Sequence, residues 1–397
     1  MEIDWSSSEN RVLINPRFPE PQAKELLSWV GKVSEQFQSH FFLLSSGTTA
    51  KSTRDLKWVA LSKEAVLASA EAVNCRLFSN SNDVWLHPLP NFHVGGLGIW
   101  ARSFLSGARV VKLPENEKWN VDHFVSCLLN EGITLTSLVP TQVYDLVQRR
   151  ICSPPRLRAV LVGGGALSCE LEGQARALGW PVVPTYGMTE ASSGIAMAEL
   201  GCSSLKVLSH FRVEVAEGGR LKIKGCSLLS ATIFCDQGKV CCVDPKENGW
   251  FLTQDRAVIQ DGFISILGRI GDFVKIGGES VELSRLRDIF EQVLLSLRSE
   301  FVSGGSATAD VALMAVPDER LGHTIHLVGD CRLSSIEASL LVDHFNAKVL
   351  GFERIRNWHC LRNLRDGLPR TSLGKLMDPE CLKLIHAQMG DGVSDGL

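Results

Sequence analysis

The chain has 397 residues, and its 41 Lys and Arg nearly balance its 44 Asp and Glu, which leaves a formal charge of −3. So small a net charge argues against a protein that binds nucleic acid or a membrane surface through electrostatic attraction. Hydrophobic residues make up 45% of the chain, which is too many for a disordered protein and enough for a core that this length usually divides between two domains. No apolar run reaches the ~18 residues of a membrane span, and the first residues lack the basic and apolar segments of a signal peptide.

The twelve cysteines and ten histidines are scattered along the chain, without any C-x-x-C pair. A disulfide-rich domain would be shorter and denser in cysteine, and a zinc site would show closely spaced ligands. We therefore interpret the cysteines as reduced core residues and expect a cytoplasmic protein.

Helical and strand patterns alternate from about residue 61 to residue 187. Short apolar or β-branched runs bounded by turn residues predict strands at residues 84–86, 109–113, 134–139, 157–162 and 181–186. The segments between them predict helices at residues 63–78, 121–130 and 142–150, and one that begins after Ser168 and ends near Gly179. This alternation predicts a mostly parallel sheet covered by helices.

The pattern changes after about residue 202. A hairpin of residues 211–215 and 221–224 is followed by short strands at 231–234, 240–243, 250–253 and 263–267, which we interpret as a small β-barrel or curved sheet. From Gly268 onward, amphipathic helices at 283–297 and 335–349 flank a strand at 311–316. The predicted fold is α/β, with a large N-terminal domain over residues 1–267 and a smaller α+β C-terminal domain over residues 268–397.

Three segments of the larger domain have residues suited to a nucleotide. Residues 45–49 (Ser-Ser-Gly-Thr-Thr) can surround phosphate oxygens with N–H and O–H donors, although no Walker G-K-[ST] closes the loop. Residues 163–165 are three glycines between a strand and a helix, without G-x-G-x-x-G spacing. Residues 186–190 (Tyr-Gly-Met-Thr-Glu) offer a ring, a hydroxyl and a carboxylate at a strand end. Each segment alone also fits an ordinary turn.

Two further features lie toward the C-terminus. Asp255 and Arg269 are fourteen residues apart and together suit a ribose diol, although a surface salt bridge is the simpler explanation. Lys375 follows a glycine turn and can place a point charge on a phosphate in an interdomain cleft, although a solvated basic loop is the better explanation when this segment is taken alone.

In this order, the five features resemble the motifs of the adenylate-forming superfamily of acyl-CoA synthetases, luciferases and peptide-synthetase adenylation domains. Residues 45–49 resemble its phosphate loop and residues 186–190 its Y-G-x-T-E motif. Residues 253–255 (Thr-Gln-Asp) stand where the family has T-G-D, residues 268–272 resemble its hinge, and residues 369–375 resemble its catalytic-lysine motif. The resemblance extends from about residue 41 to the C-terminus.

This resemblance implies an enzyme that activates a carboxylate with ATP and Mg²⁺ as an acyl-adenylate, releases pyrophosphate and transfers the acyl group to CoA. Its catalytic groups would be Lys375, Glu190 and Thr189, with Glu190 holding Mg²⁺. Gly271 would be the hinge of a mobile C-terminal domain. The nucleotide contacts implied in the same way are Ser45, Ser46, Gly47, Thr48, Thr49, Gly163, Gly164, Gly165, Tyr186, Gly187, Met188, Asp255 and Arg269.

One branch of the superfamily is especially similar. Residues 89–99, together with Arg102 and residues 137–142, resemble the o-succinylbenzoate–CoA ligases of menaquinone biosynthesis. In that branch an arginine in the helix after the F-H motif binds the distal carboxylate of the substrate, and Arg102 stands at that position; a helix-surface arginine is the alternative. His93 and Gly95 would border the acyl site, and a general-base role is the other interpretation of His93.

The chain also departs from the family. The usual phosphate-loop lysine position holds Thr53, which leaves Lys51 or Arg54 as substitutes, and the hinge position holds glycine. About 44 residues precede the phosphate loop, so we expect an N-terminal subdomain that is truncated relative to the family. A ligase for another aryl or short-chain acid and a degenerate nucleotide-binding protein without ligase activity therefore stay open as alternatives. We expect no nucleic-acid partner and no membrane span, and the sequence does not decide between a monomer and a homo-oligomer.

Overall fold

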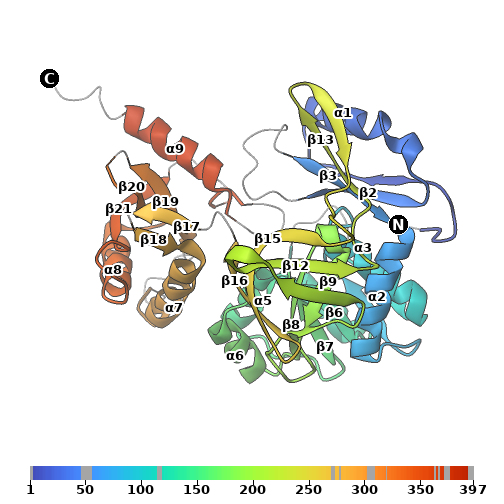
Figure 1. Ribbon diagram of the computed structural model, residues 1–397. Helices are drawn as coiled ribbons and strands as arrows, with labels where there is room; N and C mark the ends of the chain where they lie inside the picture. The colour runs from blue at the N-terminus through green and yellow to red at the C-terminus, as the bar shows by residue number, and fades with distance from the viewer. Residues whose placement is uncertain are drawn as a thin grey trace. The chain divides into compact units, whose positions relative to one another are not determined.

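The computed structural model describes residues 3–45, 56–113, 119–269, 273–276, 279–301, 309–318, 320–361, 364, 367–370 and 376–391. Contacts within the chain divide it into two compact units, Met1–Leu267 and Gly268–Leu397. Figure 1 shows the helices and strands of both units, which are described separately below.

The larger unit contains most of the regular structure. Its helices are α1 (Glu20–Gly31), α2 (Lys63–Leu77), α3 (Val94–Ser106), α4 (Val121–Asn130), α5 (Pro140–Gln148) and α6 (Cys169–Ala177), with short 3-10 turns η1 (Ser34–Gln36), η3 (Thr189–Ala191) and η4 (Glu217–Gly219). Its first strands are β1 (Arg11–Leu13), β2 (His40–Ser45), β3 (Lys57–Ser62), β4 (Val84–His87), β5 (Arg109–Lys112), β6 (Leu135–Leu138), β7 (Ala159–Val162) and β8 (Val182–Met188). The later strands are β9 (Ser193–Met197), β10 (Lys206–Val207), β11 (Phe211–Val215), β12 (Arg220–Gly225), β13 (Ala231–Asp236), β14 (Lys239–Val243), β15 (Phe251–Gln260) and β16 (Phe263–Arg269).

Polar side chains cap three of the predicted helices of this unit, α2, α4 and α6. The hydroxyl of Ser62 accepts a hydrogen bond from the backbone N–H of Ala65 at the start of α2, with an O–N distance of 3.0 Å. Asn120 and Ser168 cap α4 and α6 in the same way. Each cap satisfies an N–H that has no partner within its own helix. The observed bounds confirm the predicted helices at residues 63–78, 121–130 and 142–150 as α2, α4 and α5.

The strands of this unit form two sheets. The larger sheet has the order β11-β12-β15-β16-β10-β9-β8-β7-β6-β4-β5, and β5, β4, β6, β7 and β8 run parallel to one another. The second sheet has the order β1-β2-β3-β13-β14. The parallel sheet is as predicted. The strands expected as a small barrel or curved sheet instead divide between the two sheets, because β13 pairs with β3 and β10 pairs with β9.

Helices cover both faces of the larger sheet, because successive side chains of its strands pack into two different cores. Trp85 and Leu161 belong to a core with α2 and α3, whereas their neighbours Leu86 and Val162 belong to a core with α4, α5 and α6. Successive residues of a strand point to opposite faces, so both faces of these strands must be apolar. A further core joins α2 and α3 to the smaller sheet, and Figure 1 shows these layers.

The smaller unit is an α+β structure, as the sequence predicts. Its strands are β17 (Phe273–Ile276), β18 (Glu279–Glu282), β19 (Val311–Asp318), β20 (Gly322–Asp330) and β21 (Ile355–Leu361), and its helices are α7 (Leu283–Phe301), α8 (Ser335–Asn346) and α9 (Asp378–Asp391). The sheet order is β18-β17-β20-β19, with β21 also paired to β20. One core contains residues of α7 and α8, and another packs α9 against β19, β20 and β21.

Candidate active site

The predicted site segments follow the carboxyl ends of parallel strands. His93 and Gly95 come after β4, the glycines at 163–165 follow β7, and residues 186–190 end β8 and continue into η3. Because β4, β6, β7 and β8 are parallel neighbours, these ends meet at one edge of the sheet. Ligands of open α/β sheets bind at such an edge.

A hydrogen bond joins two of the predicted motifs at this edge. The hydroxyl of Tyr186 donates to a carboxylate oxygen of Asp255, with an O–O distance of 2.6 Å, although the two residues are 69 positions apart in sequence. Asp255 is only 6% exposed, and its backbone N–H donates to the hydroxyl of Thr253. That hydroxyl in turn donates to the carbonyl of Leu221 in β12. The carboxylate of Asp255 is therefore held in a fixed position beside the end of β8.

The backbone of the 186–190 segment packs closely against its neighbour. A side chain at Gly187 would place its Cβ 1.7 Å from the carbonyl oxygen of Ser193, so only glycine fits this position. The backbone N–H of Leu229 donates to the carbonyl of Glu190, which fixes the chain that carries the predicted Mg²⁺ ligand. Met188 and Thr189 are half-buried in the same segment.

The glycines after β7 also meet a side chain of β8. A Cβ at Gly163 would lie 2.5 Å from the hydroxyl oxygen of Thr185, which itself donates to the carbonyl of Val162. Gly164 has a φ of 77°, in the left-handed region that favours glycine. Gly164 and Gly165 are both exposed, so their backbone is accessible to a ligand at this edge.

Arg102 lies inside the unit and not on the helix surface. The residue is 4% exposed, and its Nη1 donates to the hydroxyl of Ser137 in β6 over 3.2 Å. Its Cζ lies 5.2 Å from the centre of the Trp85 ring. The described residues provide no carboxylate for this guanidinium, and its Nε has no hydrogen-bond partner among them. Burial without a counter-ion lowers the pKa of Arg102 to about 10.

His93 is mostly buried at the start of α3. Its ring packs against Phe92 with 4.6 Å between ring centroids. Burial lowers the pKa of His93 to about 4, because removal from water disfavours the charged imidazolium.

This pKa gives a direct expectation about pH. A lowered pKa means that His93 takes up a proton only in acid, so it should be neutral throughout pH 6–9 and contribute no ionisation to a pH–rate profile in that range. An NMR titration of the imidazole protons, with His93→Gln used to assign the resonance, checks this. A resonance that titrates near pH 6.5 would show that the ring is not shielded from water.

Of the remaining predicted residues, the structure describes Ser45 and Arg269. Ser45 ends β2, where its hydroxyl donates to the carbonyl of Lys57. Arg269 is the last residue of β16, a strand that crosses the boundary between the two units at Gly268. Six predicted residues lie outside the described ranges: Ser46, Gly47, Thr48, Thr49, Gly271 and Lys375.

The sequence matches a known protein family. The sequence profile of a family described as AMP-binding enzyme matches residues 16–220, which is slightly more than half of the chain. The chain belongs to the AMP-binding enzyme family. The resemblance to the adenylate-forming superfamily is thereby confirmed.

This AMP-binding enzyme is similar to the 2-succinylbenzoate--CoA ligase of Bacillus pumilus (strain SAFR-032), at 26% identity over 368 residues, 87% of this chain and 70% of the relative. Its fold is similar to o-succinylbenzoate CoA synthetase (MenE) from Bacillus subtilis in complex with the acyl-adenylate intermediate OSB-AMP. That structure has a TM-score of 0.70 and 24% identity, and the match covers 86% of this chain and 68% of the other. The Bacillus subtilis synthetase in complex with ATP and magnesium ion gives a TM-score of 0.68 and 25% identity, covering 86% and 69%. These neighbours confirm the predicted α/β fold.

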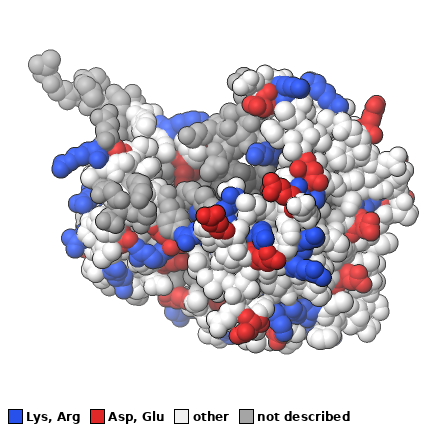
Figure 2. Space-filling model, in the orientation of Figure 1, with Lys and Arg blue, Asp and Glu red and all other residues white. Residues whose placement is uncertain are grey.

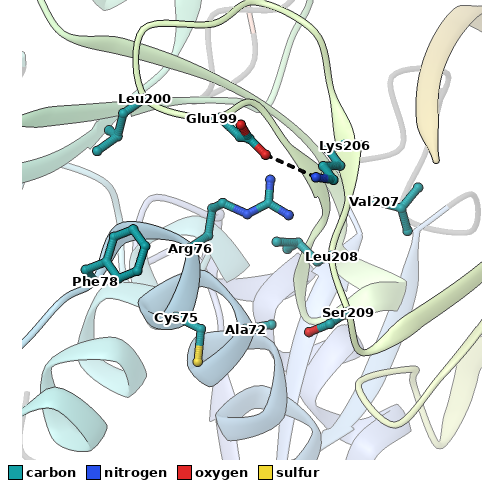
Figure 3. Close-up of a pocket in the computed structure, with 10 residues that line it drawn as sticks. All are labelled: Ala72, Cys75, Arg76, Phe78, Glu199, Leu200, Lys206, Val207, Leu208 and Ser209. Atoms are coloured by element: carbon teal, nitrogen blue, oxygen red, sulfur yellow. Dashed lines mark hydrogen bonds and ion pairs between the residues drawn. The ribbon is translucent and has the colours of Figure 1, made fainter. Parts of the chain in front are cut away.

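A separate hollow of about 580 Å³ is lined by residues from the end of α2, from the segment after β9, and from β10 and the residues after it. Its walls include Arg76 near the end of α2, and the ion pair of Glu199 with Lys206 (Figure 3). None of the described residues that line this hollow is a predicted site residue.

The distribution of charged side chains on the surface agrees with the near-neutral net charge. On the face drawn in Figure 2, basic and acidic side chains are interspersed and do not form a single basic patch. In the described ranges, every helix is too short or too polar to span a bilayer.

Two residues of the site, Trp85 and Thr253, were not predicted from the sequence to have a role there. Trp85 was assigned only to a buried strand, and Thr253 only to a motif. An apolar strand gives no local sign that one of its rings faces a buried cation, because that contact depends on how α3 packs against β4.

Proposed function

We propose that this AMP-binding enzyme is an ATP-dependent, AMP-forming acid–thiol ligase that converts 2-succinylbenzoate to 2-succinylbenzoyl-CoA, a step of menaquinone biosynthesis. The observation that carries the proposal is the bond between Tyr186 and Asp255, which brings the motifs at 186–190 and 253–255 together at the ligand-binding edge of the sheet. The names of the similar Bacillus ligases support the substrate.

The residues present suit ATP as a substrate. In our proposal the fixed carboxylate of Asp255 accepts hydrogen bonds from the ribose hydroxyls, with Arg269 as a second ribose contact. The ring of Tyr186 stacks on adenine, and the glycines at 163–165 let the base and the acyl group approach the backbone. The hydroxyls and N–H groups of Ser45, Ser46, Gly47, Thr48 and Thr49 surround the β- and γ-phosphates.

The donor set also suits magnesium. The described residues contain no group of three His, Cys, Asp or Glu that could hold a metal ion. Mg²⁺ in phosphoryl-transfer sites usually binds through one or two carboxylates together with substrate phosphates. Glu190 supplies such a carboxylate in our proposal, and the bound ion would neutralise phosphate charge.

The first half-reaction then forms a mixed anhydride. A carboxylate oxygen of the substrate attacks the α-phosphorus, the bond from that phosphorus to the bridging oxygen breaks, and pyrophosphate leaves. Lys375 stabilises the charge on the α-phosphate and the bridging oxygen, and the Thr189 hydroxyl donates to the phosphate. In the second half-reaction the thiolate of CoA attacks the acyl carbon and AMP leaves.

The buried guanidinium of Arg102 suits a dicarboxylic acid. In our proposal one carboxylate is activated and the other forms charge-assisted hydrogen bonds with the N–H groups that Ser137 leaves available. His93 and Gly95 border the acyl site, and His93 contributes shape and not a charge. After adenylation, the domain of residues 268–397 rotates about Gly271 and withdraws Lys375.

Replacement of Tyr186 by phenylalanine tests the contact that carries the proposal. The ring stays but the bond that fixes Asp255 is lost, so KM for ATP should rise about 10-fold, or ~1.4 kcal/mol, with a smaller change in kcat. Tyr144→Phe in α5 changes the only other tyrosine and is the matched control. An unchanged KM for ATP in Tyr186→Phe would remove Asp255 from the ribose site.

The substrate is tested by mass-spectrometric detection of CoA thioesters after incubation with ATP, Mg²⁺, CoA and a panel of carboxylates. We expect 2-succinylbenzoate to give the largest kcat/KM. Preference for another aryl or short-chain acid would correct the substrate while leaving the reaction intact.

A further inference from the structure

Gly98 lies one helical turn before Arg102 on α3. A Cβ at Gly98 would come within 2.8 Å of Nη2 of Arg102, 3.5 Å of its Cζ and 3.8 Å of its Nε. Side chains in a helix lean toward its N-terminus, which is why the guanidinium of Arg102 reaches back to Gly98. Glycine is a poor helix former, yet it stands here in the middle of a 13-residue helix. The absence of a Cβ at Gly98 therefore lets the guanidinium pack directly against this turn of α3.

Trp85, which lies on β4 of the larger sheet, contacts the guanidinium of Arg102. The Cζ of Arg102 lies 5.2 Å from the centre of its ring, within the range of a cation–π contact. The indole N–H of Trp85 is buried, and no described residue accepts a hydrogen bond from it. Tryptophan is therefore used here for its ring face and not for its hydrogen-bonding group.

We propose that Gly98 and Trp85 are positioning residues that set the preference of the enzyme for dicarboxylates. Trp85 supports the guanidinium of Arg102, Ser137 holds one of its nitrogens, and Gly98 lets the guanidinium lie against α3, which sets the position from which its other nitrogens receive the second carboxylate. This inference rests on the proposed function, because it assigns specificity within the same acyl site.

The first test compares Gly98→Ala with wild type on three acids. One is 2-succinylbenzoate, and the others are 4-oxo-4-phenylbutanoate and 2-propanoylbenzoate, each of which lacks one of its two carboxylates. The new methyl should displace the guanidinium, so KM for 2-succinylbenzoate should rise at least 10-fold. KM for ATP, and kcat/KM for whichever monocarboxylate is turned over, should stay within 2-fold.

Gly173→Ala is the matched control. Gly173 lies inside α6, and nothing stands within 4 Å of the position its Cβ would take. This variant should leave all three acids unaffected. A loss in Gly98→Ala that is equal for the dicarboxylate, the monocarboxylates and ATP would overturn the inference, because it would show general damage to α3.

A double-mutant cycle isolates the contact with Arg102. If Gly98 acts only by admitting the guanidinium, adding Gly98→Ala to Arg102→Ala should cause no further loss with 2-succinylbenzoate. A loss that persists undiminished in the Arg102→Ala background would overturn the inference.

Substitutions at Trp85 provide an independent test. Trp85→Phe keeps an aromatic face and removes the unpaired N–H, so it should retain most of the dicarboxylate preference. Trp85→Leu should lose at least 5-fold in the ratio of kcat/KM for 2-succinylbenzoate to that for a monocarboxylate. The inference fails if the two variants have the same ratio as wild type, or if both lose it equally.

The outcomes separate this inference from the function on which it depends. A wild-type enzyme that neither binds 2-succinylbenzoate in calorimetry nor converts it would overturn both. A wild-type enzyme that uses this acid and needs Arg102, but tolerates Gly98→Ala and Trp85→Leu, would overturn the positioning role alone.

Discussion

Replacing Lys375 by alanine is expected to lower the rate of acyl-adenylate formation by at least about 10²- to 10³-fold, the size of effect that follows loss of one preorganised group at a developing charge. The same variant should still convert supplied 2-succinylbenzoyl-AMP and CoA to the thioester at a rate near that of wild type. Lys375 is proposed to act only while the α-phosphate reacts and to leave the site before CoA attacks. Single-turnover assays of each half-reaction measure the two rates separately.

The control for this experiment is Lys383→Ala. Lys383 lies on α9, is well exposed and pairs with Glu380, so neither half-reaction should change by more than about 2-fold. Equal loss of both half-reactions in Lys375→Ala would contradict the proposed exchange of the lysine for CoA about Gly271. Retention of adenylation would contradict the role of the lysine altogether.

Replacing Arg102 by alanine is expected to reduce kcat/KM for 2-succinylbenzoate by about 10²- to 10³-fold, or ~3–4 kcal/mol. Removal of one member of a buried charged pair costs this much, because the partner then loses its counter-ion in a site with little water. KM for ATP should not change, since the predicted nucleotide contacts come from other segments. Steady-state kinetics with each substrate varied in turn gives both values.

Arg149→Ala is the matched arginine control. Arg149 forms a surface pair with Asp122, and such pairs contribute little. A monocarboxylate should be used equally well by wild type and Arg102→Ala. If Arg102→Ala keeps full activity with 2-succinylbenzoate, the guanidinium has a structural role and the acyl substrate is a different acid.

The parallel sheet and the helices α2, α4, α5 and α6 could be predicted because local signals agree with the final structure. Ser62, Asn120 and Ser168 stand at helix starts, and the strands between the helices lie in short runs rich in apolar or β-branched residues. By contrast, β9 was not predicted. Its sequence (Ser-Gly-Ile-Ala-Met) has little strand preference of its own, and it is a strand because β8 and β10 pair with it.

The first 62 residues carry few local signals apart from the apolar run of residues 41–44, which lies in β2. The helix α1 and the pairings of β1 with β2 and of β2 with β3 depend on contacts over long sequence separations. The hydrophobic periodicity of a short segment gives no information about such long-range contacts. The same limit applies to β13 and β14, which follow β12 in sequence but extend the sheet of β3.

The motifs of the site could be found in the sequence, whereas the contacts between their residues could not. Tyr186 and Asp255 were each expected to contact a nucleotide, but their mutual hydrogen bond appears only in the fold. For Arg102, the alternative of a helix-surface arginine is wrong, because α3 packs that side chain against β4 and β6. A helical pattern can show that Arg102 lies on α3, but the neighbouring strands decide whether it is buried.

The most direct test of the account is exchange of radiolabelled pyrophosphate into ATP, measured with Mg²⁺ and without CoA. Exchange requires that ATP and a carboxylate react reversibly to an acyl-adenylate, and it does not depend on the second half-reaction. We predict exchange that depends on 2-succinylbenzoate and is lost in Lys375→Ala. Absence of exchange with 2-succinylbenzoate and with every other carboxylate supplied would contradict the account and would favour a nucleotide-binding protein without ligase activity.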